Sequence, residues 1–204
     1  MTSRCLGAVL AGGAGRRLGG SAKGLLEVGG VRIIDRVRAA LHEGCDEVLL
    51  IANDPEAVRW LPGVRVIPDA RVGLGAAGGV HAALVAAQGA DVVVVAWDLP
   101  FVTASMVRLL RSRTTDVDAV VCEKLGSRWG VEPLCGCYRA ACLPALERRL
   151  GDGDVRAGAW LADVRLATVG RETLAEIGDP DMLLMDVDTE QDLAAARRHA
   201  EATA

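Results

Sequence analysis

Two features of the sequence have residue types that suit the binding and transfer of a phosphate group. The first is the loop at residues 10–23, in which five glycines allow backbone N–H groups to converge on phosphate oxygens. Its cationic side chains are Arg16, Arg17 and Lys23. The second is Asp98, which comes just after a strongly apolar run. A carboxylate and substrate phosphates together are a usual ligand set for Mg²⁺, so the sequence predicts phosphoryl or nucleotidyl transfer.

The loop at residues 10–23 differs from two common phosphate-binding motifs. It contains neither G-x-G-x-x-G nor the Gly-Lys-Ser/Thr that closes a P-loop. It resembles the signature L-A-G-G-x-x-x-R-M-G-x-x-K of sugar-nucleotide pyrophosphorylase-like nucleotidyltransferases. The matching residues are Leu10, Ala11, Gly12, Gly13, Arg17 and Lys23, with Leu18 in the place of the methionine. The alternative is a tight strand-to-helix turn with solvated cations, which needs fewer glycines and cations than this loop has.

The composition restricts the class of protein. The 204 residues are 51% hydrophobic but only 3% aromatic, which favours a core of Val, Leu, Ile and Ala, as in a buried parallel sheet. The net charge of −4 argues against nucleic acid or an anionic membrane as the main partner. The first apolar run is too brief for a signal peptide, and no stretch approaches the ~20 apolar residues that span a bilayer. We therefore expect a cytoplasmic protein.

The cysteines are scattered along the sequence. None forms a Cys-x-x-Cys pair, which predicts six reduced core residues. An alternative is a soft-metal cluster of Cys135, Cys137 and Cys142.

The elements of the first half alternate between strand and helix. Buried strands are predicted at residues 6–10, 47–51, 64–67 and 91–96, helices around residues 34–41, 56–61 and 80–87, and a hairpin at Gly29–Gly30. This order predicts an α/β fold with a doubly wound, Rossmann-like, mostly parallel sheet and helices on both faces. Ligands of such sheets bind outside the carboxyl ends of the strands. The segments expected to converge there are the loop at 10–23, Asn53, Asp69, the glycine-rich loop at 73–79 and Asp98.

The second half is less regular. Strands are predicted at residues 118–123, 131–138, 164–168 and 183–187, and helices at 105–110, about 140–150, 155–162 and from about 190. Pro133 lacks a backbone N–H, so its strand is expected near an edge of the sheet. No linker is visible. We expect a single domain over 1–204, in which about 1–100 bind the nucleotide and about 101–204 shape the acceptor side.

Further motifs extend the resemblance over nearly the whole chain. They are Lys23-Gly-Leu-Leu26, Val66-Ile-Pro-Asp69, Gly78-Gly-Val-His-Ala-Ala-Leu84, Asp98-Leu-Pro-Phe101, Glu132-Pro-Leu134, Cys142-Leu-Pro-Ala-Leu146 and Asp186-Val-Asp-Thr-Glu-Gln-Asp-Leu193. With the first loop, they resemble the molybdenum cofactor guanylyltransferase family. The resemblance implies a nucleotide-diphospho-sugar transferase-like fold. It also implies transfer of GMP from GTP to molybdopterin, with Mg²⁺ as cofactor and pyrophosphate as the second product.

The resemblance also implies site residues. Those that would bind the nucleotide are Leu10, Ala11, Gly12, Gly13, Lys23, Asn53, Asp69 and Asp98. Asp98 would bind Mg²⁺, while Arg17 and Lys23 would stabilise the charge that grows on the leaving pyrophosphate. The implied partners are GTP and molybdopterin, with transient contacts to proteins that deliver or accept the cofactor. The alternative for Asp98 and Asp69 is a turn or helix cap.

The sequence departs from the family where the base is expected. Ile51 replaces the first Asn of Asn-Ala-Asn, and Ala76–Ala77 stand in the loop that is Gly-Pro-Leu-Ala/Gly-Gly in relatives. Guanine selectivity is therefore less firmly implied than nucleotidyl transfer. The alternatives are transfer of CMP or transfer to a phosphosugar, a nucleotide-binding protein without turnover, and a dinucleotide-dependent oxidoreductase.

Three further side chains have two interpretations. Asp186 and Asp188 stand where relatives have Asn-x-Asn, and on the predicted strand at 183–187 they would share one face. One of them would complete the Mg²⁺ shell opposite Asp98 or hold a water or an acceptor hydroxyl; alternatively, Asp188 caps the last helix and Asp186 is solvated. His81 suits either a ligand contact or a helix face.

Overall fold

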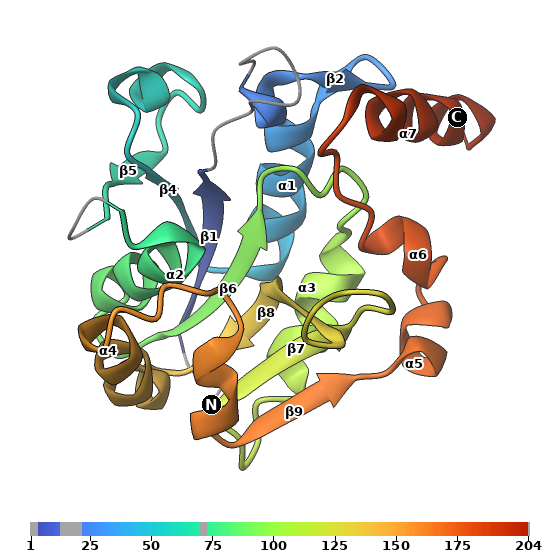
Figure 1. The fold of residues 1–204 in the computed structure, drawn as a ribbon. Coiled ribbons are helices and arrows are strands. Elements are labelled where there is room, and N and C mark those ends of the chain that lie inside the picture. Colours follow the sequence, from blue (N-terminus) through green and yellow to red (C-terminus); the bar gives the residue numbers. More distant parts are fainter. Residues whose placement is uncertain (1–3, 13–21, 70–72, 204) are drawn as a thin grey trace.

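The chain folds around a seven-stranded sheet with the order β5-β4-β1-β6-β8-β7-β9 (Figure 1). The computed structural model describes residues 4–12, 22–69 and 73–203. The strands are β1 (Cys5–Ala11), β4 (Glu47–Ala52), β5 (Arg65–Ile67), β6 (Asp91–Ala96), β7 (Ala119–Glu123), β8 (Val131–Tyr138) and β9 (Leu166–Val169). All neighbouring pairs are parallel except those of β8, which is antiparallel to β6 and β7. The predicted mostly parallel sheet is confirmed.

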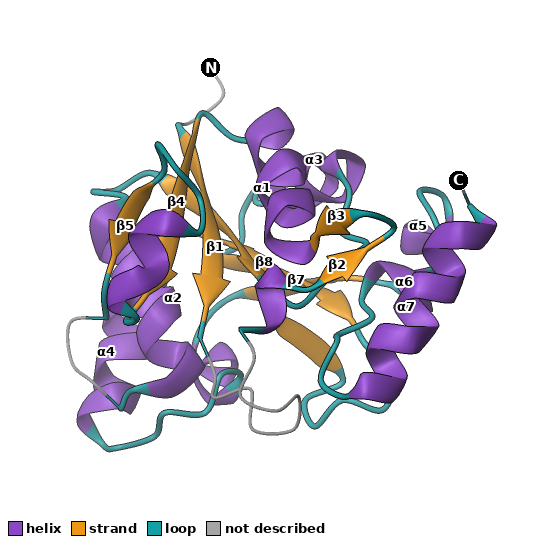
Figure 2. Ribbon diagram, turned by 90° about the horizontal axis from the view of Figure 1, so that it is seen from above, coloured by secondary structure: helices purple, strands orange, loops and turns teal. Residues whose placement is uncertain are grey.

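Helices cover both faces of this sheet (Figure 2). They are α1 (Ile33–Gly44), α2 (Gly75–Ala86), α3 (Ala104–Ser112), α4 (Leu143–Gly151), α5 (Arg171–Ala175), α6 (Pro180–Leu183) and α7 (Glu190–Ala202). One hydrophobic cluster contains side chains of α1, α3 and α7, and a second contains those of α2 and α4. β1 separates them, because Cys5 and Val9 belong to the first cluster and Leu6 and Leu10 to the second. None of the helices in the described ranges is long and apolar enough to cross a membrane.

The order of the strands creates a switch point beside β1. From β1 the chain adds β4 and β5 on one side, and after α2 it places β6 on the other side. Such reversals open a crevice outside the carboxyl ends of the strands. β7 runs in the same direction as β6, because both are antiparallel to β8. The residues that follow β1, β6 and β7 therefore emerge at one edge of the sheet.

The predicted hairpin is confirmed as β2 (Glu27–Val28) paired with β3 (Val31–Arg32). Gly29 and Gly30 have φ angles of 59° and 71°, as the turn of a two-residue hairpin requires. The hairpin leads directly into α1.

The expected edge position of the strand with Pro133 is wrong, because β8 lies between β6 and β7. The pairing register between β7 and β8 shifts, so that Val121 faces Gly136 while Cys122 faces Glu132. This irregularity leaves Pro133 outside both ladders, where no backbone N–H is needed.

Three other expectations for secondary structure are wrong. The strand expected at 183–187 is absent from the described ladders, because Asp179 caps α6 and the segment after it pairs with no strand. The region 155–162 forms only a short 3₁₀ helix, Ala159–Asp163, whereas the short helix expected at 56–61 is present as a 3₁₀ helix, Pro55–Arg59. α2 begins at Gly75 rather than near residue 80, so most of the glycine-rich loop is helical.

The cysteines are buried, except for the half-buried Cys45, and all six are unpaired. Cys135 and Cys137 lie in one hydrophobic cluster and Cys142 in the other, so the three do not form a common metal site.

Candidate active site

A cavity of about 450 Å³ lies at the carboxyl edge of the sheet. It is lined by residues at the ends of β1, β4 and β6 and by the beginning of α2. The residues predicted to bind the nucleotide that line it are Leu10, Ala11, Gly12, Lys23, Asn53, Asp69 and Asp98. Gly13 and Arg17 lie outside the described residues. Segments that are far apart in the sequence thus converge at the switch point.

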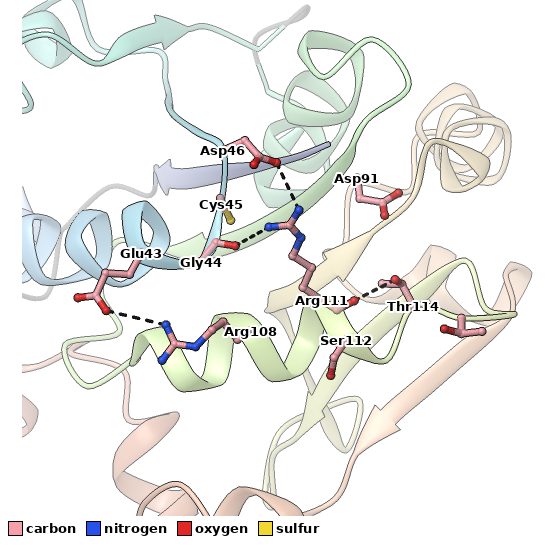
Figure 3. A pocket seen from close by; sticks show the side chains of 10 residues that line it. Glu43, Gly44, Cys45, Asp46, Asp91, Arg108, Arg111, Ser112 and Thr114 are labelled. Atoms are coloured by element: carbon pink, nitrogen blue, oxygen red, sulfur yellow. Dashed lines mark hydrogen bonds and ion pairs between the residues drawn. The ribbon is translucent and has the colours of Figure 1, made fainter. Parts of the chain in front are cut away.

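A larger cavity, of about 660 Å³, lies near the opposite edge, where β4 and β6 begin (Figure 3). Its polar groups pair with one another: Arg111 donates to the Gly44 carbonyl (2.9 Å) and to Asp46 (3.3 Å), and Arg108 contacts Glu43 (3.9 Å). None of the residues predicted to do chemistry lines it. We therefore take the smaller cavity as the candidate active site.

Lys23 is held at this cavity by a 3₁₀ turn, Lys23–Leu25, that packs on an aromatic pair. A Cβ atom on Gly24 would collide with the ring of Trp97, so only glycine lets the turn approach so closely. Trp97 in turn stacks on Trp60, with 5.1 Å between ring centroids. The sequence analysis did not predict this support of Lys23 by Trp97 and Trp60.

The ammonium group of Lys23 lies between two carboxylates. Its Nζ is 3.7 Å from Asp98 Oδ2 and forms a close ion pair with Asp188 Oδ1. The amide of Val187 donates to the Asp98 carbonyl (3.0 Å), which holds the segment at 186–188 beside the end of β6. Lys23 and Asp98 are mostly buried, with side chains 14% and 19% exposed.

Burial and charge act on these groups in opposite directions. Burial raises the pKa of Asp98 to about 6; the Lys23 charge lowers it, and Asp188 adds to the rise. Burial disfavours the charged form of Lys23, but the hydrogen bond to Asp188 and the charge of Asp98 outweigh it and raise the pKa of Lys23. Lys23 therefore stays protonated. The charge of Lys23 does not fully offset the effect of burial on Asp98, so a further cation would stabilise the Asp98 carboxylate.

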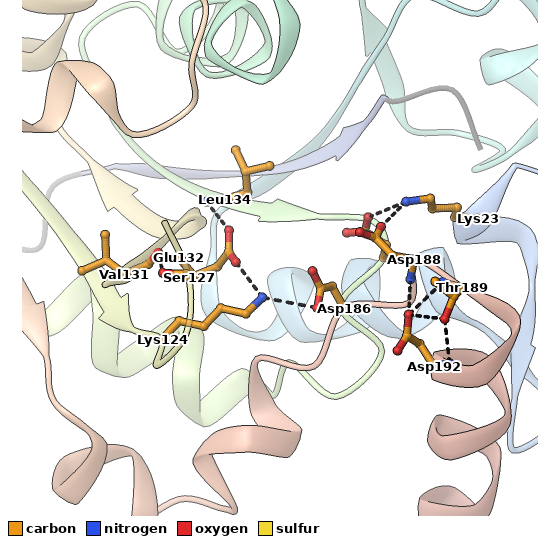
Figure 4. A network of polar contacts seen from close by, with 11 residues as sticks. Lys23, Lys124, Ser127, Val131, Glu132, Leu134, Asp186, Asp188, Thr189 and Asp192 are labelled. Carbon is orange, nitrogen blue, oxygen red and sulfur yellow. Dashed lines mark hydrogen bonds and ion pairs between the residues drawn. The ribbon is translucent and has the colours of Figure 1, made fainter. Parts of the chain in front are cut away.

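A second lysine occupies a similar position farther along the edge (Figure 4). Lys124 follows β7, and its Nζ lies 2.9 Å from Glu132 Oε2 and 3.4 Å from Asp186 Oδ1. Burial opposes its charge, but the Glu132 and Asp186 carboxylates raise the pKa of Lys124. The sequence interpretation missed this residue. A signal was available, since Lys23 and Lys124 are the only lysines in the sequence.

The hypothesis that Asp188 caps the last helix is wrong. The N-cap of α7 is Thr189, whose Oγ1 accepts from the Asp192 amide (3.2 Å), while Asp192 Oδ2 accepts from the Thr189 amide (2.8 Å). This capping box leaves the Asp188 side chain to pair with Lys23. Asp186 and Asp188 both face the lysines at the site, although the segment that carries them is not a strand.

We expect Thr189→Ala to lower the free energy of unfolding by about 1 kcal/mol, because it removes the side-chain cap of α7. Asp188→Asn should cost less than Thr189→Ala, since it leaves the cap intact and its amide oxygen can still accept from Lys23. Urea denaturation measures both. A larger loss in Asp188→Asn than in Thr189→Ala would contradict the assignment of the cap.

On the other side of the cavity, Asn53 and Asp69 bind each other. Asn53 Nδ2 donates to Asp69 Oδ2 (2.9 Å), and the Asp69 amide donates to Asn53 Oδ1 (2.8 Å). Asp69 is thus held by Asn53 rather than acting as a helix cap. Within the described residues, the side-chain contact of Asp69 is made by Oδ2, so Oδ1 can accept from a ligand.

The glycines of α2 allow this helix to lie close to the cavity. A Cβ on Gly79 would be 3.3 Å from Leu10 Cδ2 and 3.7 Å from Ile51 Cγ2. Tertiary contact therefore outweighs the low helix propensity of glycine. His81 faces away from the cavity: its Nε2 lies 3.5 Å from Glu147 of α4, which favours the helix-face interpretation.

The carboxylates at the end of β6 suit a magnesium ion. Asp98 and Asp188 approach the same ammonium group, so both side chains point to one place and offer hard oxygen donors. Within the described ranges, no group of three or more His, Cys, Asp or Glu side chains forms a metal cage. Mg²⁺ commonly needs only one or two carboxylates and completes its shell with water and substrate phosphates.

The chain is similar to known proteins over most of its length. It is 35% identical to a protein named probable molybdenum cofactor guanylyltransferase from Pelotomaculum thermopropionicum, over 96% of this chain and 93% of that protein. It is 31% identical to the molybdenum cofactor guanylyltransferase of Desulfosudis oleivorans, over 93% of each chain. Among solved structures, molybdopterin-guanine dinucleotide biosynthesis protein A from Archaeoglobus fulgidus has 25% identity and a TM-score of 0.81, and the match covers 97% of this chain and 99% of that one.

The expected resemblance is thereby confirmed. Residues 7–169 match the MobA-like NTP transferase domain, a range that contains Lys23, Asp69 and Asp98. With the cavity at the switch point of the sheet and two relatives above 30% identity, the chain belongs to the MobA-like NTP transferase family.

Proposed function

We propose that this protein transfers GMP from GTP to molybdopterin, with Mg²⁺, in the cytoplasm, and releases pyrophosphate. The observation that carries the proposal is the convergence of Lys23, Asp98 and Asp188 beside a cavity at the end of β1. The names of the relatives support the choice of donor and acceptor. Proteins that deliver molybdopterin or receive the finished cofactor would be transient partners.

In the proposed reaction, an oxygen of the molybdopterin phosphate attacks the α-phosphorus of GTP. A new P–O bond forms, the bond to the bridging α,β-oxygen breaks, and pyrophosphate leaves with the electron pair of that bond. Lys23 is placed to bind the oxygens on which this negative charge grows. The attacking phosphate is already ionised near neutral pH, so no general base is required.

Asp98 and Asp188 would hold the Mg²⁺. When bound, the ion would supply charge stabilisation for the phosphates of GTP. Lys23 now occupies the space between these carboxylates, and its ammonium has three N–H donors for these two carboxylate partners. It can therefore keep its place at the site and still donate to a phosphate oxygen.

The base would bind between the end of β4 and α2. Guanine presents two adjacent N–H donors on its Watson–Crick edge, and a carboxylate accepts such a pair. The Asp69 carboxylate, held by Asn53, lines the cavity and suits this role. Leu10, Ile51 and Gly79 would form an apolar surface for the ring.

Cytosine remains the second candidate base, because Ile51 offers no hydrogen bond. Cytosine has only one donor group, its amino group, on the corresponding edge, so a carboxylate discriminates against it. We propose that residues 1–100 bind the nucleotide and that the remaining residues bind the acceptor. Asp188 is the exception, since it reaches across to Lys23.

We expect GTP with Mg²⁺ to raise the melting temperature more than ATP, CTP or UTP does. At a GTP concentration of 100 times Kd the stabilisation is about 2.7 kcal/mol, which corresponds to roughly 5–10 °C for a chain of this length. Asp69→Asn should reduce the preference for GTP, because an amide presents only one acceptor oxygen. A larger shift with CTP would assign the chain to cytidylyl transfer instead. Pyrophosphate release on addition of molybdopterin separates an enzyme from a binding protein without turnover.

A further inference from the structure

Lys124 is unusual because lysine is rare in this chain. Lys23 and Lys124 are the only lysines among 23 basic residues, and every other cation is an arginine. Lysine differs from arginine in presenting a compact ammonium with three N–H donors rather than a planar fork. Both lysines lie at the carboxyl edge of the sheet, each between two carboxylates. Each ammonium contacts two carboxylates among the described residues, which leaves a third N–H for a ligand.

The two lysines lie at opposite ends of one short segment (Figure 4). Asp186 contacts Lys124, and Asp188 contacts Lys23. Residues two apart along a chain are separated by at most about 7 Å between their Cα atoms. The strands that precede Lys124 and Asp98 are separated only by β8, which places them about 10 Å apart. These spacings suit two phosphate groups that bind side by side.

The direction of the proposed reaction assigns different phosphates to the two lysines. In an in-line displacement, the attacking and leaving oxygens lie on opposite sides of the α-phosphorus. Lys23 binds the leaving side in the proposed function. The attacking phosphate must then approach from the other side, and Lys124 lies at the other end of the Asp186–Asp188 segment from Lys23 (Figure 4).

The two carboxylates around Lys124 are not equivalent. Glu132 is 15% exposed, lies at 2.9 Å from the ammonium, and is itself held by the Leu134 amide (3.0 Å). Asp186 is 49% exposed and lies at 3.4 Å. Glu132 therefore fixes the lysine, whereas Asp186 is the weaker partner and can give way to an incoming anion. Leu134 lines the nucleotide cavity, so this pair lies next to the proposed reaction site.

We propose that Lys124 binds the terminal phosphate of the acceptor, that Glu132 positions the lysine, and that the acceptor phosphate displaces Asp186. This inference rests on the proposed function, because it takes the reaction direction from it. It assigns an acceptor-binding residue to a cluster that is otherwise only an ion-pair network.

The first test is the KM for molybdopterin. Lys124→Met should raise this KM by about tenfold to a hundredfold, the effect of losing one hydrogen bond to a charged group. Asp186→Asn should lower it several-fold, because it removes the competing carboxylate, and this gain should disappear in the double variant. The Mg²⁺ requirement and the KM for GTP should stay within about twofold in both single variants.

A matched control is Arg65→Met, which removes one positive charge from an ion pair with Glu47 (3.1 Å) where β4 and β5 begin, at the opposite edge. It should leave both KM values unchanged. If Asp186→Asn raises the KM for molybdopterin or the Mg²⁺ requirement, Asp186 binds acceptor or metal directly and the inference is overturned.

A second test uses the unaltered protein. A lysine-directed acylating reagent has only two side-chain targets here, so mass spectrometry can follow each one. GTP with Mg²⁺ should protect Lys23, and further addition of molybdopterin should protect Lys124. Protection of Lys124 by GTP alone, or no protection by molybdopterin, contradicts the assignment.

Failure of the proposed function has a separate signature. If unaltered protein does not transfer GMP to molybdopterin, the proposed function fails. The role of Lys124 alone fails if the unaltered protein transfers GMP normally but the Lys124→Met variant has an unchanged KM for molybdopterin. An unchanged rise in melting temperature with GTP and Mg²⁺ shows that this variant is folded.

Discussion

Asp98→Ala is expected to reduce GMP transfer by on the order of a thousandfold while the protein stays folded. Asp98 supplies one of the two carboxylates that converge on the proposed metal position, and its side chain is largely removed from solvent. Burial raises the pKa of this carboxyl to about 6 even though Lys23 lies beside it. Without Mg²⁺, the charged form of Asp98 therefore does not stabilise the fold. Its removal should therefore affect the reaction far more than the melting temperature.

The matched control for this variant is Asp91→Asn. Asp91 is the first residue of β6, whereas Asp98 follows the last, so the two carboxylates lie at opposite edges of the sheet. Turnover should stay within about threefold of the unaltered protein once its folding has been verified by melting. Comparable turnover in Asp98→Ala and Asp91→Asn, measured as pyrophosphate release at saturating Mg²⁺, would rule out the role of Asp98.

Lys23→Ala is expected to reduce turnover by about a hundredfold or more and to weaken GTP binding. The ammonium group is the described cation closest to Asp98, and no other described cation pairs with Asp188. Its loss removes the charge that meets the leaving pyrophosphate. It also leaves Asp98 and Asp188 side by side without a counter-charge, so Mg²⁺ alone should raise the melting temperature of this variant more than that of the unaltered protein.

Lys23→Arg is the informative control. It keeps the charge, but a planar guanidinium replaces a compact ammonium. Asp98 and Asp188 surround this group, and the close packing of Gly24 on the Trp97 ring restricts movement of the backbone. We expect turnover between that of Lys23→Ala and the unaltered protein. Full turnover in Lys23→Ala, measured with saturating GTP, would show that the leaving group is stabilised elsewhere.

Local features of the sequence were sufficient for the strands of the first half and for Asp98. A run such as Asp91–Ala96 is apolar at almost every position, which only a strand buried on both faces explains, and the polar residue after it must then lie at the sheet edge. The paired glycines of the hairpin have the same local character, since their positive φ angles exclude most other residues.

Residues 183–187 and Pro133 needed the tertiary structure. An apolar stretch becomes a strand only if a neighbouring strand offers its free N–H and C=O groups, and residues 183–187 have none. Pro133 is tolerated inside the sheet because a shift in pairing register, which involves two other strands, removes the need for its missing N–H. Neither the missing partner strand nor the shift in pairing register can be predicted from the residues near these positions.

Some features of the candidate active site also follow from the sequence, whereas others depend on the tertiary structure. The sequence by itself determined the glycine-rich loop that ends at Lys23 and the positions of Asn53, Asp69 and Asp98 after strands, because strand direction alone brings such strand ends together. Only the tertiary structure decided which carboxylate meets which lysine. Asp188 pairs with Lys23 across 165 residues because Thr189 caps α7 and a backbone hydrogen bond fixes Val187 against Asp98. Ion pairs depend on distances of a few ångströms between distant segments, and no local pattern of residues encodes those distances.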